Sequence, residues 1–147
     1  MPGREYPRTV AECLDGGFRY RRGVVAATRA FKRSGPWRGT LAEREQKFAL
    51  LNGALAEVYG IPAPKLRFES IDGSFSGASS CLRRTAGEPA IITMRGRLSV
   101  VTYLHEFAHA LGHGERGGCR WSINLFRRVF PAQFARLGTN GHTLRRR

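Results

Sequence analysis

The segment 105–109, which reads His-Glu-Phe-Ala-His, combines residue types that can carry out metal chemistry. On a helix, positions four apart lie on one face, so His105 and His109 can bind one ion through their imidazoles. Glu106 points to the adjacent side, where its carboxylate can take a proton from a water that the ion has made acidic. The pattern therefore predicts a Zn²⁺ site with His105 and His109 as ligands and Glu106 as general base.

A catalytic zinc also needs a third protein ligand and one position left open for water. We expect Glu115 in this role, because Gly112 lies between it and His109 and can turn the chain back beneath the ion. His113 continues the spacing of four, but on a straight helix it would lie about 12 Å from His105, too far for both to reach one ion. The candidates that stay open beside Glu115 are His142, Cys119 and His113.

Local sequence signals predict how the motif is positioned. Residues 99–111 are typical of a helix, with Ser99 as its N-cap and Gly112 as its stop. A short run at 90–94 favours a strand, and a basic turn at 95–97 joins it to the helix. The positions of this helix expected to face the core are Val101, Leu104, Ala108 and Leu111.

The remaining elements complete an α+β fold. Thr40 and Glu43 form a capping box that predicts a helix over 41–59. The core is then a small sheet of three or slightly more strands, packed on this helix and on the motif helix, and followed by a C-terminal helix. The other expected elements are a loose start at 1–15, a short helix within 18–33, strands at 65–69 and 74–82, a Gly-rich loop at 112–118, and a helix over 120–137 broken at Pro131.

The length of 147 residues leaves room for one domain with one modest core. We expect a basic N-terminal extension at 1–39, the core at 40–137, and a flexible basic tail at 138–147. No apolar run reaches the roughly 20 residues of a membrane span, and the N-terminus lacks a signal-peptide pattern, so a cytoplasmic location without membrane contact is expected. The cysteines are odd in number and widely spaced, which favours free thiols: Cys13, Cys81 and Cys119.

The formal net charge of +14 is the second strong signal, and arginine supplies most of it. Residues 18–38 and 116–147 contain no acid, which favours contact with nucleic-acid phosphates. Aromatic side chains lie among these cations and could stack on the bases of single strands. They are Phe18, Tyr20, Phe31 and Trp37.

The segment 40–137 resembles a minimal zincin and is most similar to the small intracellular metallopeptidase-type domains of the SprT-like and ImmA/IrrE-like groups. The resemblance rests on the run 89–94, the motif helix and the apolar helix at 121–131. It implies zinc ligation by His105 and His109, catalysis by Glu106, and a strand edge that pairs with an extended substrate.

Known zincins supply the third ligand in different ways. A second helix provides a glutamate in gluzincin-like proteins, whereas a distant histidine does so in SprT-like ones, where His142 would correspond. The spacing to Glu115 is similar to the metzincin signature. Metzincins also need a downstream Met-turn, and this chain has only Met1 and Met94, so that clan is not assigned.

The expected function is a zinc-dependent metallopeptidase-like hydrolase that cleaves peptide bonds in a protein or peptide substrate. Because the chain is strongly basic, nucleic-acid-associated proteins are one candidate class of substrate. The alternative is a zincin-derived regulatory or DNA-binding protein that keeps the zinc but has little proteolytic activity. No particular oligomeric state is predicted.

Overall fold

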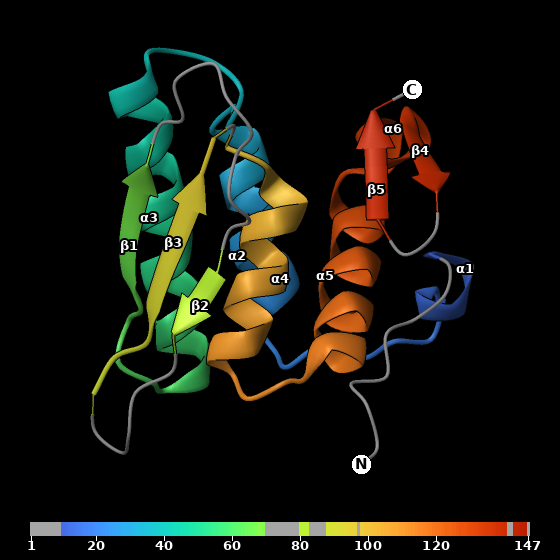
Figure 1. Cartoon of the computed structure of the whole chain (residues 1–147), viewed down its shortest axis with the longest axis horizontal. Helices are drawn as coiled ribbons and strands as arrows, with labels where there is room; N and C mark the ends of the chain where they lie inside the picture. The colour runs from blue at the N-terminus through green and yellow to red at the C-terminus, as the bar shows by residue number, and fades with distance from the viewer. Residues whose placement is uncertain (1–9, 70–79, 83–87, 97, 141–142, 147) are drawn as a thin grey trace.

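The computed structural model describes residues 10–69, 80–82, 88–96, 98–140 and 143–146 (Figure 1). It confirms the α+β class and the small three-stranded sheet. None of the described helices is long and apolar enough to cross a membrane. The elements are α1 (Val10–Cys13), α2 (Val24–Arg33), α3 (Leu41–Tyr59), β1 (Lys65–Glu69), β2 (Ser80–Leu82), β3 (Ile91–Arg95), α4 (Val100–Ala110), α5 (Glu115–Val129), α6 (Pro131–Ala135), β4 (Leu137–Asn140) and β5 (Thr143–Arg146).

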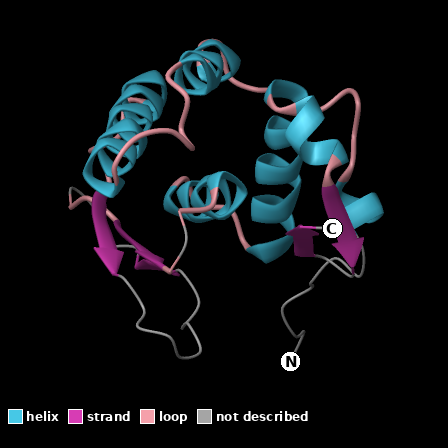
Figure 2. Ribbon diagram, turned by 90° about the horizontal axis from the view of Figure 1, so that it is seen from above, coloured by secondary structure: helices cyan, strands magenta, loops and turns pink. Residues whose placement is uncertain are grey.

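The three-stranded sheet has the order β1-β3-β2, with β1 parallel and β2 antiparallel to the central strand β3. All the described helices lie on one side of this sheet (Figure 2). Because side chains alternate along a strand, Ile92 and Met94 share the face that points toward the helices, and both are buried in the main core. The strand expected at 74–82 is described only from Ser80 onward.

Helix α3 forms as its sequence signals predict. Thr40 accepts a hydrogen bond from the backbone N–H of Glu43, whose side chain accepts one from the Thr40 N–H in return. Gly60 adopts the left-handed conformation, with φ of 63°, and ends the helix. The apolar stripe of this helix packs on the core: Phe48, Leu51, Leu55 and Val58.

The N-terminal residues pack more closely than expected. Val24 and Phe31 of α2 belong to the main core, so this part of the expected extension is integral to the fold. Val10 and Cys13 of α1 are buried against α5. The Asn124 side chain fixes the C-terminal end of α1, because it donates to the Cys13 carbonyl and accepts from the Asp15 N–H. At the other end, β4 and β5 pair as an antiparallel hairpin where a tail without structure was expected.

The second half of the Gly-rich loop predicted at 112–118 is helical, so that prediction was wrong. Gly114 is the N-cap of α5, and Gly117 and Gly118 lie in its first turns. Two glycines favour a loop by propensity, but here they let α5 approach α4 closely, a tertiary contact that propensity does not register.

Tyr103 links α4 to α3 inside the core. Its ring is fully buried, and its hydroxyl donates a hydrogen bond of 2.8 Å to Oδ1 of Asn52, whose amide in turn donates to the Pro64 carbonyl. Burial raises the pKa of the Tyr103 hydroxyl well above its ordinary value, so it stays a donor.

Tyr103→Phe removes the donor and leaves the buried Asn52 oxygen without its partner. We expect a loss of about 1–3 kcal/mol in the free energy of unfolding, the usual cost of an unsatisfied buried polar group. Urea unfolding followed by circular dichroism measures it, with an unchanged m-value showing that the denatured state is the same. An unchanged midpoint would show that water replaces the hydroxyl and that this bond does not stabilise the α3–α4 contact.

Candidate metal centre

Helix α4 presents its two histidines at the surface of the core. Ser99 caps the helix, as predicted, by accepting a hydrogen bond from the Thr102 N–H at 3.2 Å. Leu104 and Ala108 are buried on one side of the helix, whereas His105 and His109 are only partly buried. The imidazole rings lie 4.6 Å apart between centroids, as a spacing of four residues on a helix requires.

A tight turn brings the next helix back to these rings. Gly112 has φ of 107°, which non-glycine residues rarely adopt, and it turns the chain as the sequence predicted. The His113 N–H donates to the Ala108 carbonyl, which holds the turn against the end of α4. Helix α5 then begins at Glu115, so the carboxylate lies at a helix N-terminus that also favours negative charge.

The three side chains converge at short distances. Nε2 of His109 lies 3.0 Å from Nε2 of His105 and 2.8 Å from a carboxylate oxygen of Glu115, whose other oxygen lies 3.3 Å from Nε2 of His105. Zinc–ligand bonds of about 2.0–2.1 Å place two ligand atoms of a tetrahedral site about 3.3 Å apart. The two Nε2 atoms and one oxygen of Glu115 lie within 4.8 Å of one another, so small shifts of the side chains would bring them to one face of a zinc coordination tetrahedron.

Gly118 makes this convergence possible. A Cβ atom at Gly118 would lie 3.4 Å from Cε1 of His105 and 3.6 Å from Cε1 of His109, so the backbone of α5 lies directly against both rings. A Cβ atom alone would make ordinary van der Waals contact with the rings, whereas a larger, branched side chain would push the helix, and Glu115 with it, away from the imidazoles. The sequence alone did not reveal this close packing at Gly118, although an adjacent glycine pair near the start of an amphipathic helix is a signal of it.

Each histidine has a partner on the ring nitrogen that faces away from the site. Nδ1 of His109 lies 2.8 Å from the His113 carbonyl oxygen, so it carries the proton and donates, which leaves Nε2 with a lone pair for a metal. Nδ1 of His105 lies 3.8 Å from Sγ of Cys119. The orientation of both rings thus presents Nε2 toward Glu115.

The structure separates the candidates for the third ligand. Cys119 lies on the Nδ1 side of His105, with its Sγ 3.8 Å from that nitrogen, and thus on the side of the ring away from Nε2 and Glu115. His113 contributes its backbone carbonyl, and its ring lies beside Gly117. His142 lies outside the described residues. Among the described residues, the one group with ligand atoms close enough to hold a metal is His105, His109 and Glu115.

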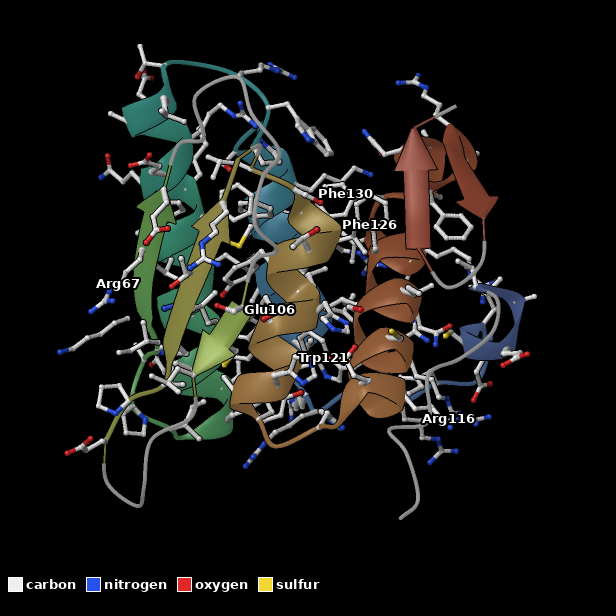
Figure 3. All side chains as sticks on the ribbon, viewed as in Figure 1. Arg67, Glu106, Arg116, Trp121, Phe126 and Phe130 are labelled. Atoms are coloured by element: carbon white, nitrogen blue, oxygen red, sulfur yellow. The ribbon has the colours of Figure 1, made fainter. Side chains whose placement is uncertain are left out.

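Glu106 is the buried acid of the site. Its side chain is 6% exposed, and Figure 3 shows it on the side of α4 nearer the sheet. Burial raises the pKa of its carboxyl to about 7; Glu115 also raises this pKa and His109 lowers it. A divalent cation nearby would lower it again.

No protein-family model matches the chain, and neither a curated protein nor a solved structure matches it. The character of the site therefore rests on its own residues. Two neutral imidazole nitrogens and one carboxylate, each 18–24% exposed, form a partly open group with the donor set of a three-ligand zinc site.

The role of Glu115 as the third ligand can be tested by removing its carboxylate. We expect one zinc per chain in protein purified with zinc. Glu115→Ala should raise the zinc dissociation constant, because it removes a ligand. The increase should exceed the roughly 10–100-fold that follows the loss of a residue supporting a ligand. Elemental analysis and competition with a chelating dye measure this, with the exposed Glu57→Gln as the charge-matched control. Equal zinc affinity in Glu115→Ala and Glu57→Gln would exclude Glu115 as a ligand.

The short distance between α5 and α4 at Gly118 can be tested by adding a larger side chain there. Gly118→Val should weaken zinc binding although every ligand is retained, because the branched side chain presses on both imidazoles. Gly53→Val in α3 is the control, since a Cβ there meets no atom within 4 Å. Both variants carry the same gain in helix propensity over glycine, so zinc titration compares the packing effect alone. Unchanged zinc affinity in both would contradict the close approach.

Proposed function

We propose that this chain is a zinc-dependent, peptidase-like hydrolase of the zincin kind, in which His105, His109 and Glu115 hold the ion and Glu106 acts as general base. The observation that carries the proposal is the convergence of the three ligand atoms at 2.8–3.3 Å. The origin of Glu115 in a second helix, α5, adds support, because gluzincin-like proteins also take their third ligand from a second helix. Here the connection between the two helices is much shorter.

Zinc held by these side chains would supply a water of lowered pKa and would polarise the oxygen of a scissile carbonyl. The residues of the chain provide the remaining steps. The Glu106 carboxylate takes a proton from the attacking water and then gives it to the leaving amine. The His113 carbonyl keeps the proton of His109 on Nδ1 throughout, so that Nε2 remains a ligand.

The buried position of Glu106 favours an enzyme over a purely structural metal site. Burying a carboxyl disfavours its charged form, which is why the pKa of this side chain is raised. A metal held only for stability needs no such group beside its ligands, and an apolar side chain would pack at that position without this cost. The regulatory alternative keeps the zinc but gives Glu106 no task.

Substitution of Glu106 distinguishes a hydrolase from a regulatory protein that only keeps the zinc. Glu106→Gln should keep zinc at one per chain, because Glu106 is not among the three converging ligands. The hydrolysis of fluorogenic casein and of an unstructured peptide mixture should fall at least about 100-fold, the usual contribution of a general base. Glu57→Gln on the exposed side of α3 serves as the control for loss of one carboxylate.

Two outcomes would contradict the proposal. Undiminished hydrolysis in Glu106→Gln would remove the general base from the mechanism. Zinc binding by wild-type protein, with no cleavage of either substrate above the level of Glu106→Gln, would favour the regulatory alternative.

A further inference from the structure

The fold joins two basic segments that lie far apart in the sequence. Residues 16–42 carry seven cations and no acid, and residues 116–147 carry eight arginines and no acid. The Tyr20 hydroxyl donates to the Trp121 carbonyl at 2.5 Å, and the Arg128 guanidinium donates to the Phe18 carbonyl at 2.7 Å. Helix α2 also packs against α5. The two acid-free segments are therefore neighbours in the fold.

The arginines of α5 lie away from the metal centre. At 100° per residue, Gly118 and Glu115 define the side of the helix that meets α4. The arginines fall on other sides, and most lie roughly opposite: Arg116, Arg120, Arg127 and Arg128. On α2, Arg29 and Arg33 are exposed on the side opposite the buried Val24 and Phe31. We call the surface formed by Arg22, Arg29, Arg33, Arg127 and Arg128 the α2–α5 basic face.

Aromatic rings hold several cations in and around this face. Arg128 lies 5.2 Å from the centroid of the Tyr20 ring, Arg21 5.6 Å from that of Tyr59, and Lys32 5.8 Å from that of Phe130. A side chain already held over a ring loses less conformational freedom when it binds a ligand. Guanidinium groups also match phosphate oxygens through paired N–H donors. The face is thus partly organised for phosphate before any partner arrives.

The rings that the sequence suggested for base stacking already pack against other aromatic side chains. Phe31 is buried, and Phe18 packs on Tyr20 with centroids 4.8 Å apart. Trp37 is 44% exposed, but it packs edge-on against Phe130. Phe31 is therefore excluded from base stacking, and contact with the phosphate backbone is the mode that the arginines of the face favour.

We propose that the α2–α5 basic face binds the phosphate backbone of double-stranded nucleic acid without reading its sequence. A duplex has a high density of fixed phosphates, which a rigid set of arginines can contact together. A membrane is a poorer fit, because the face lacks the row of exposed large apolar side chains that insertion requires. Since the metal ligands lie on a different side of α5, this binding does not depend on the proposed hydrolase activity.

The test uses fluorescence anisotropy with a labelled 30-base-pair DNA duplex at several salt concentrations. Arg29→Gln/Arg33→Gln should weaken binding at least about 10-fold and lower the slope of log affinity against log salt by about 2, one for each lost phosphate contact. Lys65→Gln/Arg67→Gln removes two exposed cations from β1, which lies across the molecule from α5 (Figure 3). This control has the same net charge and should change affinity less than about two-fold.

Several results would overturn the proposal. Equal losses in both double variants would mean that overall charge, not this face, governs binding. Tighter binding of a single strand than of the duplex by more than about ten-fold would mean that bases are contacted. Binding to vesicles containing phosphatidylserine, together with no duplex binding at 50 mM salt, would assign the face to membranes. Melting temperatures of all variants, measured alongside, check that each is folded.

Discussion

The close contact between α4 and α5 is the constraint on which the rest of the structure depends. Two neighbouring turns of α4 supply the imidazoles, and only an adjacent helix at very short distance can bring a carboxylate to the same point. Gly118 provides that distance, and Gly112 provides the turn that reverses the chain within five residues of His109. The metal centre is therefore a consequence of two glycines as much as of its three ligands.

This arrangement also explains why the ligands remain in place before an ion is bound. Glu115 lies at the N-terminus of α5, where the helix dipole stabilises its charge, and its two oxygens lie 3.3 Å from Nε2 of His105 and 2.8 Å from Nε2 of His109. The His113 carbonyl fixes the His109 ring from the other side. Such contacts reduce the reorganisation that metal binding requires, because the three ligand atoms already lie near their coordinated positions.

The sequence predicted the parts of this structure that depend on local signals. The capping box at Thr40, the N-cap at Ser99 and the strand at 65–69 appear where propensity and periodicity indicated, because the atoms that stabilise them are close in sequence. The predicted start of the last helix, at residue 120, was wrong because the first turn of α5 is stabilised by packing against α4. The base-stacking role of Phe31 lost its support for a similar reason: only the tertiary fold shows that the core needs this ring.

Helix α5 contributes residues to both the metal centre and the α2–α5 basic face, because different residue types recur on its different sides. Small residues on the α4 side, such as Gly118 and Ser122, let the metal centre close, and Ser122 satisfies its hydroxyl within the helix by donating to the Gly118 carbonyl. Arginines cover the opposite side, and between the two sides Trp121 stacks on Phe107 in the core. A ligand on the basic face and an ion at the metal centre would thus bind to the same rigid element from different sides. Coupling between them requires a shift of α5 relative to α4, and the core contacts of Trp121 resist that shift, so the two sites should act independently.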